Sequence, residues 1–313
     1  MEYITLKNTD IKVSRLCMGG CPMGGYGWGN VQENELIDAV NKALDIGVNF
    51  FDTAETYGLG QSEITLGKAL GSRRDKAVIS DKFGVHAMKG QPTFYDNSHD
   101  YIIEACEGSL KRLGTDYIDV YTVHYRDGKT PLCEVAETLD ELKKQGKIRY
   151  AALSNIHEDD KAELESLKGR FVSFQDEYSL ACRKNEKEML DFAQNFSLTP
   201  LTWGSLGQGI LTGKYNLDNV NFGADDRRSR EIYVNFHGEK LKKNLEIVEV
   251  LKKISSEVGK SVSAVAIRFI LDFLPDSVVI TGIKRPSQLL SNAEALDWHL
   301  NAQQIKMLDD ISK

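Results

Sequence analysis

The segment Asn49-Phe50-Phe51-Asp52-Thr53-Ala54-Glu55-Thr56-Tyr57-Gly58 carries an apolar run up to an aspartate, and a tyrosine follows five positions later. A short apolar run that ends in glycine-rich sequence predicts a buried strand passing into a loop. Asp52 is then expected at the C-terminal edge of this strand, with Tyr57 above the same edge. Because a charge is costly in apolar surroundings, Asp52 needs a cationic or hydrogen-bonding partner. A helix N-cap is the alternative role for this aspartate.

The same apolar pattern recurs along the chain. Short apolar runs occur at 15–18, 48–51, 77–80, 117–123, 148–153, 171–174, 200–203 and 277–280. Longer segments of helical period lie between them, such as 35–44 and 133–145. This regular alternation requires parallel strands, because each helix returns the chain to the same end of the sheet. Eight such units predict an α/β fold, a closed (β/α)8 TIM barrel, in one domain spanning residues 1–313.

The two ends of the chain and one loop complete the predicted fold. Residues 3–13 predict an N-terminal β-hairpin, and residues 302–312 predict a C-terminal helix. The segment 204–240, rich in Gly, Asn, Asp and Arg, predicts a functional loop. The alternative fold is an open doubly wound sheet, which normally carries Gly-x-Gly-x-x-Gly after its first strand. Residues 19–25 (GGCPMGG) lack that spacing, so the barrel is favoured.

Composition argues against several classes of partner. The net charge of -7 and the pI near 5.5 argue against nucleic acid or an anionic membrane. No apolar run is long enough to span a bilayer, and no secretory signal is visible at the N-terminus. Five dispersed cysteines predict reduced thiols in a cytoplasm, and the six histidines show no metal-ligand spacing. We therefore expect a cytoplasmic protein without a metal site, and the sequence defines no oligomeric state.

Polar or aromatic residues stand at the predicted C-terminal ends of the strands, where the chemistry of a parallel barrel gathers. They are Asp52, Lys82, His124, Ser154, Asn155, Gln175, Trp203 and the segment Gly282-Ile283-Lys284-Arg285. Singly, each has an ordinary explanation, such as a solvated lysine, a hydrogen-bonded core histidine or a helix cap. Together they place polar groups at one end of the barrel and predict an active site there.

One kind of chemistry suits this set of residues. Tyrosine has a pKa near 10 and is a poor acid at neutral pH. A cation from Lys82 beside the phenol of Tyr57 is expected to lower that pKa, while Asp52 balances the lysine charge. His124 is expected to orient a carbonyl oxygen by a hydrogen bond. Such a site protonates a carbonyl oxygen while hydride reaches the carbon, and hydride requires a cofactor.

The chain resembles the aldo-keto reductases over nearly its whole length. The segments that carry the resemblance are 49–58, 81–84, 123–127, 153–155, 175–179, 204–214 and 282–292. The resemblance implies an Asp-Tyr-Lys-His tetrad, here Asp52, Tyr57, Lys82 and His124, with Tyr57 as the proton donor. It also implies NADP(H) as the cofactor, bound in an extended form across the barrel mouth without a Rossmann fold.

The resemblance further implies which residues hold the cofactor and the substrate. Ser154, Asn155 and Gln175 are expected at the carboxamide, Trp203 against the nicotinamide face, and the loop 204–214 over the pyrophosphate. The full expected cofactor set is Asp52, Ser154, Asn155, Gln175, Trp203, Gly204, Ser205, Leu206, Gly207, Gly209, Lys214, Gly282, Ile283, Lys284, Arg285, Gln288 and Asn292. Tyr26 and Trp28, together with Tyr57 and His124, are expected to line the substrate pocket; surface packing is the alternative for residues 26–29.

Three positions need separate comment. Gly204-Ser205-Leu206 stands where the family commonly has Ser-Pro-Leu, and Ser291 stands where an acidic residue often contacts the adenine. Lys284 and Arg285 precede Pro286, which is suited to start a helix. A helix N-terminus beside two cations favours a phosphate, so we expect this segment to bind the 2′-phosphate of NADPH. Two solvated cations flanking a turn are the alternative.

The sequence thus predicts an NADP(H)-dependent oxidoreductase that interconverts a small-molecule carbonyl (aldehyde, ketone or sugar) and an alcohol. One alternative is a redox-sensing partner protein resembling the potassium-channel β-subunits, which would require a large exposed apolar patch. The other is a cofactor-free barrel isomerase that uses Lys82 or His124, which leaves Lys284, Arg285 and the glycine-rich loop unexplained. The substrate and the direction of reaction are left open.

Overall fold

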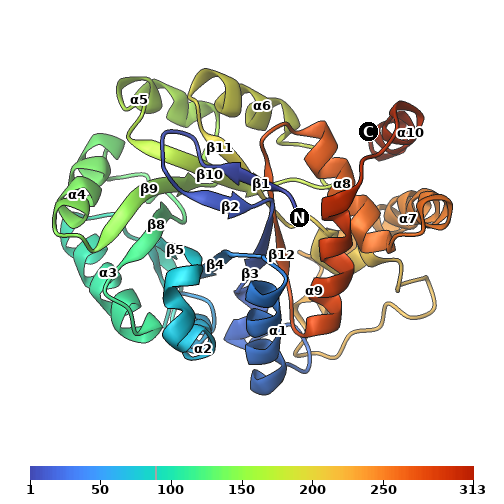
Figure 1. Ribbon diagram of the computed structural model, residues 1–313, viewed down its shortest axis with the longest axis horizontal. Helices are drawn as coiled ribbons and strands as arrows, with labels where there is room; N and C mark the ends of the chain where they lie inside the picture. The colour runs from blue at the N-terminus through green and yellow to red at the C-terminus, as the bar shows by residue number, and fades with distance from the viewer. Residues whose placement is uncertain (89) are drawn as a thin grey trace.

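The computed structural model describes residues 1–88 and 90–313, and its centre is a closed barrel of parallel strands (Figure 1). Around the barrel the strands follow their order in the chain: β3 (Leu16–Gly19), β4 (Phe50–Ala54), β5 (Val78–Phe83), β8 (Ile118–Val123), β9 (Ile148–Ser154), β10 (Phe171–Glu177), β11 (Thr199–Trp203) and β12 (Val278–Gly282). β12 pairs with β3 and closes the ring. The predicted (β/α)8 TIM barrel is confirmed.

Helices surround the barrel as an outer layer (Figure 1). They are α1 (Glu33–Asp45), α2 (Gln61–Leu70), α3 (His99–Leu113), α4 (Leu132–Lys144), α5 (Lys161–Ser166), α6 (Glu186–Asn195), α7 (Gly238–Val258), α8 (Val262–Phe273), α9 (Pro286–Ala293) and α10 (Ala302–Ser312). α1 shows the pattern, because Leu36, Ala39, Val40 and Ala43 share one buried face. Within the described residues, none of these helices has the length and apolarity that crossing a bilayer requires.

The apolar core has two layers. The larger layer lies between the strands and the helices, and the smaller one fills the barrel interior. The inner layer continues into the N-terminal hairpin, formed by β1 (Tyr3–Thr5) and β2 (Lys12–Ser14). Leu6, Ile11 and Val13 from this hairpin segment pack against the inner layer. Since the backbone N–H of Lys7 bonds Thr199 at the start of β11, the hairpin closes the N-terminal end of the barrel and leaves the C-terminal end open.

The structure differs from the sequence prediction in three places. Asp52, Lys82 and Gln175 lie inside β4, β5 and β10 and not after them. Strands continue past their apolar runs because these polar side chains pair with one another inside the barrel. The loop 204–240 contains three short 3-10 turns, η4 (Gly207–Thr212), η5 (Arg227–Ser229) and η6 (Val234–Phe236). A small hairpin of β6 (Val85–His86) and β7 (Phe94–Tyr95), which no sequence pattern indicated, follows β5.

Candidate active site

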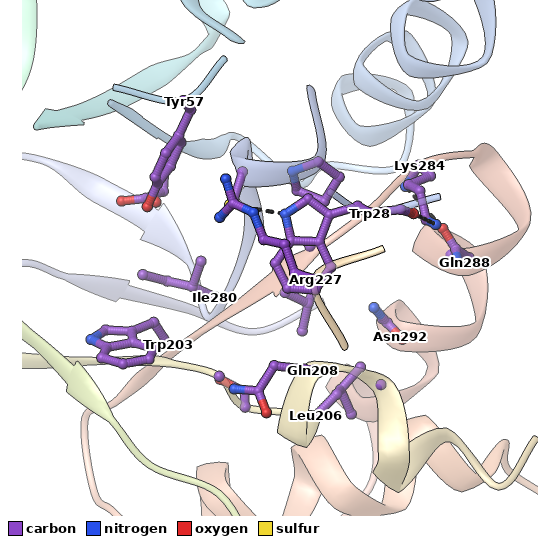
Figure 2. A pocket seen from close by; sticks show the side chains of 18 of the residues that line it. Trp28, Tyr57, Trp203, Leu206, Gln208, Arg227, Ile280, Lys284, Gln288 and Asn292 are labelled. Carbon is purple, nitrogen blue, oxygen red and sulfur yellow. Dashed lines mark hydrogen bonds between the residues drawn. The ribbon is translucent and has the colours of Figure 1, made fainter. Parts of the chain in front are cut away.

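A cavity of about 780 Å³ opens at the C-terminal ends of the barrel strands. Figure 2 shows Tyr57 and Trp203 toward one end of this cavity and Lys284, Gln288 and Asn292 toward the other. Its walls therefore join the predicted catalytic residues to the predicted phosphate-binding segment in one continuous space.

The four predicted catalytic residues meet at one end of the cavity. The ammonium group of Lys82 donates to Asp52 Oδ1 at 2.5 Å and to the hydroxyl of Tyr57 at 3.3 Å. A third bond, 3.2 Å to the carbonyl oxygen of Thr53, uses the last donor of this ammonium. The ring of His124 stands edge-on to that of Tyr57, with centroids 5.8 Å apart. Lys82 is thus fixed between a carboxylate and a phenol, as the predicted chemistry requires.

Backbone contacts fix the loop that carries Tyr57. The carbonyl oxygen of Asp52 accepts the N–H of Gly20 at 2.6 Å. A Cβ at Gly58, which has φ 65°, would lie 2.2 Å from the carbonyl oxygen of Gly24. Only residues without a side chain permit this close approach, so the loop after β3 presses directly on the Tyr57 loop. The glycines of both segments thereby allow the two loops to pack against each other.

Burial controls the protonation of the two titratable groups beside Lys82. Burial, reinforced by the negative charge of Asp52, raises the pKa of Tyr57 well above its usual value. This corrects the expectation that Lys82 lowers it, because Asp52 neutralises the lysine charge while the phenol loses its contact with water. Burial, followed by the nearby charge of Lys82, lowers the pKa of His124 well below its usual value. At neutral pH the site therefore holds a protonated phenol and a neutral imidazole.

Gln175 and Trp203 present unsatisfied polar atoms in the same region. Gln175 Nε2 donates to Asp52 Oδ2 at 2.8 Å and to Ser80 Oγ at 3.1 Å, while its Oε1 is buried and has no partner in the described part of the chain. Trp203 Nε1 is also buried without a partner among the described residues. Buried polar atoms without partners are rare in native proteins and indicate a missing group. A carboxamide such as that of nicotinamide offers an N–H donor to Gln175 Oε1, so these residues fit the cofactor that the sequence predicted.

The opposite end of the cavity is strongly cationic. Lys214, Arg228, Lys284 and Arg285 lie near one another there. Arg227 lines the cavity between the two ends (Figure 2), and in the described part of the chain Asp52 is the one carboxylate on the wall. Burial, followed by the positive charges of Arg228, Lys214 and Arg285, lowers the pKa of Lys284. Asp226 balances Arg228 from behind the wall, with contacts of 2.8 and 2.5 Å. The remaining excess of positive charge fits a ligand with several phosphates.

Comparison with known proteins agrees with this geometry. Residues 15–313 match the family model described as the aldo/keto reductase family. The chain is 35% identical to the aldo-keto reductase YhdN of Bacillus subtilis, over 99% of this chain and 93% of that protein. The chain belongs to the aldo/keto reductase family. It is accordingly an oxidoreductase that acts on carbonyl or alcohol groups.

Other family members show the range of related proteins. A probable voltage-gated potassium channel subunit beta of Oryza sativa is 34% identical over 95% of this chain and 92% of its own length. Among solved structures, the glycerol dehydrogenase AKR11B4 from Gluconobacter oxydans is 32% identical, with a TM-score of 0.89 and coverage of 99% and 94%. An aldo/keto reductase from Klebsiella pneumoniae, in complex with NADP and acetate, is 25% identical, with a TM-score of 0.74 and coverage of 98% and 94%.

Most of the residues expected at an aldo/keto reductase site line the cavity, and three do not. Gly207 and Ile283 are buried beside the wall, and Tyr26 is exposed on the surface. Tyr26 accepts a hydrogen bond from Arg230 and lies under the guanidinium of Arg227, so it packs on the surface as the alternative interpretation proposed. Trp28 does line the cavity, and its carbonyl oxygen accepts from Lys284 Nζ at 2.5 Å.

The sequence did not single out several residues of the cavity wall. Arg227, Arg228 and Tyr233 come from the loop 204–240, and Ser261 and Ser263 come from the start of α8. The arginine content of the loop was the signal that could have indicated these residues. Nothing in the sequence indicated which segment the loop contacts. Arg227 donates its backbone N–H to the carbonyl oxygen of Gly27 at 3.0 Å, a contact between segments 200 residues apart in the sequence.

One further group of side chains lies outside the cavity. His157, Asp176 and Glu188 have ligand atoms within 4.8 Å of one another, and they come from the turn after β9, from β10 and from α6. His157 Nδ1 lies 3.0 Å from Glu188 Oε2, which is the geometry of an ordinary hydrogen bond. The prediction of no metal site stays a prediction.

Proposed function

We propose that this chain is an NADP(H)-dependent carbonyl reductase or alcohol dehydrogenase of cytoplasmic location, with Tyr57 as the proton donor in the reduction. The observation that carries the proposal is the position of Lys82 Nζ between Asp52 and Tyr57, at one end of a cavity whose other end is cationic. The five unpaired cysteines support a reducing compartment. NADP in the Klebsiella pneumoniae relative supports the choice of cofactor.

The residues of the cavity have separate tasks in holding NADP(H). Gln175 Oε1 would accept the carboxamide N–H, and Trp203 would lie against the nicotinamide ring. Lys214 and Arg228 would face the pyrophosphate, and Lys284 and Arg285 would face the 2′-phosphate at the start of α9. When bound, the cofactor supplies or accepts the hydride.

The proton step depends on groups of this chain alone. Tyr57 carries its proton at neutral pH, because burial raises its pKa, and it can therefore donate to a carbonyl oxygen. Lys82 lies 3.3 Å from the phenol oxygen and stabilises the phenolate that remains. His124, neutral because burial lowers its pKa, orients the oxygen without competing as an acid.

The cofactor assignment is tested by charge removal at the start of α9. We predict that replacing Lys284 and Arg285 together by alanine weakens NADPH binding by about 2–4 kcal/mol, from about 1.5–3 kcal/mol per charged hydrogen bond less some compensation. NADH binding is expected to change little, because NADH lacks the 2′-phosphate. Fluorescence titration with each cofactor measures both affinities.

Two controls separate recognition from structural damage. Arg285→Ala alone tests the charge, since Arg285 is exposed, whereas Lys284 also bonds the carbonyl of Trp28. Lys306→Ala, an exposed cation on α10, is expected to leave both affinities unchanged. Equal weakening of NADPH and NADH in the double variant would mean that the pair holds the loop together. A preference of the wild type for NADH would refute the assignment.

A further inference from the structure

A cluster of buried acids lies behind the catalytic residues, on the outer side of the barrel wall. Asp81 immediately precedes Lys82 in β5, Glu63 lies on α2, and Glu55 lies between β4 and α2. Asp81 and Glu63 are fully buried. Arg112 on α3 is the cation of the cluster, and it contacts Glu63 through two bonds of 2.6 and 3.1 Å. The proposed reaction uses none of these four side chains.

The carboxyl group of Asp81 is incompletely bonded. Its Oδ1 accepts the backbone N–H of Lys82 at 2.9 Å, while its Oδ2 is buried and no donor among residues 1–88 and 90–313 bonds it. The carboxyl group of Glu63 lies within hydrogen-bond reach. Two carboxylates cannot bond each other, because both only accept. A proton on Asp81 Oδ2 resolves this, since the O–H then donates to the Glu63 carboxylate in a charge-assisted bond.

The charges around Asp81 favour the same protonation state. The titratable groups that face it are Glu63 on α2, Glu55 from the β4–α2 loop, Cys106 and Arg112 on α3, Tyr121 on β8 and Lys82 on its own strand. With every acid ionised, three carboxylates would share Arg112, because Asp52 already balances Lys82. Burying uncompensated charge is costly. Burial, followed by the charge of Glu63, accordingly raises the pKa of Asp81 well above its usual value.

We propose that Asp81 carries a proton at neutral pH and that its O–H donates a hydrogen bond to the Glu63 carboxylate. This hydrogen bond positions Lys82 against Tyr57. The bond links β5, which carries the lysine, to α2, which begins just after the tyrosine loop. Ser62, next to Glu63, donates its backbone N–H to the carbonyl oxygen of Tyr57 at 3.1 Å. Asp81 is therefore a positioning residue that acts through the strand and the helix.

Infrared spectroscopy tests the proton directly. The difference spectrum of wild type minus Asp81→Asn at neutral pH is expected to show the carbonyl stretching band of a protonated carboxylic acid. Asp119→Asn is the matched control, because Asp119 is equally buried on β8 but pairs with Arg74 and Arg149 at 2.8 and 2.9 Å. Its difference spectrum is expected to show only carboxylate bands. Carboxylate bands for Asp81 would overturn the proposal.

Kinetics test the positioning role, which rests on the proposed function. Asp81→Asn keeps a donor toward Glu63 and is expected to keep kcat close to the wild-type value. Asp81→Ala loses the donor, and displacement of Lys82 is expected to lower kcat by about 10- to 100-fold, with the Kd for NADPH unchanged. Equal kcat in the two variants would overturn the positioning role. A wild type without carbonyl reduction would refute the proposed function. The infrared result would still decide whether Asp81 is protonated.

Discussion

At the scale of single residues, the tetrad combines groups that modify one another. Lys82 contacts both Asp52 and Tyr57, and Asp52 in turn accepts from Gln175. The contact expected between Gln175 and the carboxamide of the cofactor is therefore linked, through Asp52, to the charge of Lys82. Removal of any one group changes the environment of the others, so the losses are not expected to add.

Paired substitutions measure this coupling. Lys82→Met is expected to lower kcat strongly, because the phenolate loses its counter-charge. Asp52→Asn is expected to be milder, since the carbonyl oxygen of Thr53 still holds Lys82 at 3.2 Å. The double variant should lose little more than Lys82→Met alone, as judged from kcat/KM for one carbonyl substrate. A double loss equal to the product of the single losses would show that the two residues act independently.

Glu55 makes stability depend on pH. Burial raises the pKa of Glu55 from 4.5 to about 7, although its carboxylate accepts from the N–H groups of Gly84 and Val85. The folded protein thus binds this proton more tightly than the unfolded chain. The stability that this proton contributes to the folded state is fully present below the pKa of the unfolded chain and is lost as pH rises through about 7. The shift in pKa corresponds to about 3 kcal/mol in the free energy of unfolding.

Glu55→Gln tests the sign of this effect. Glutamine keeps the acceptor oxygen and removes the titration. Urea unfolding from pH 4.5 to 8 should therefore show a smaller fall in the free energy of unfolding for the variant than for wild type. Parallel curves for the two proteins would mean that Glu55 does not titrate in this range.

At the scale of elements, Arg183 contacts several residues that hold the last helix. Arg183, after β10, donates to Asp309 at 2.8 Å and to Ser312 at 2.6 Å, both on α10. Arg183 also contacts Glu186 and stacks near Phe273, with 4.8 Å to the ring centroid. The helix itself was predictable from its period, but this attachment was not, because its partners are about 130 residues apart.

We predict that Arg183→Ala lowers the free energy of unfolding by about 3–5 kcal/mol, since it removes the cation that Glu186 and Asp309 share in a partly buried site. Asp309 then keeps only the surface contact with Lys313. Lys313→Ala is the control, because Lys313 pairs with the same Asp309 at the surface and should cost less than about 1 kcal/mol. Denaturant unfolding measures both variants. Similar small losses would mean that α10 docks through its apolar face alone.

At the scale of the whole molecule, local patterns sufficed for the barrel, and long-range contacts decided the rest. The eight apolar runs and the helical periods between them were enough to predict the closed sheet, and strand ends were enough to bring Asp52, Lys82 and His124 together. The pKa of Tyr57 is raised, whereas the sequence led us to expect that it is lowered. Burial and the Asp52–Lys82 pair decide this pKa, and both are properties of the folded barrel. We propose that residues 1–313 form one domain, since the hairpin and α10 both pack on the barrel.

The cover of the cavity shows why the site was only partly predictable. Tyr26 and Trp28 are two residues apart, yet one packs on the surface and the other lines the cavity. The difference depends on Arg227 and Lys284, which reach this segment from the far part of the chain. No local pattern in residues 26–29 carries that information.

The rate of carbonyl reduction by Tyr57→Phe, measured with saturating NADPH, tests the proposed chemistry most directly. Phenylalanine keeps the ring against His124 and removes the hydroxyl that Lys82 contacts. We predict that kcat falls by about 10²–10⁴-fold, while the Kd for NADPH from fluorescence titration stays nearly unchanged. A variant that keeps most of the wild-type rate would contradict the assignment of Tyr57 as the proton donor.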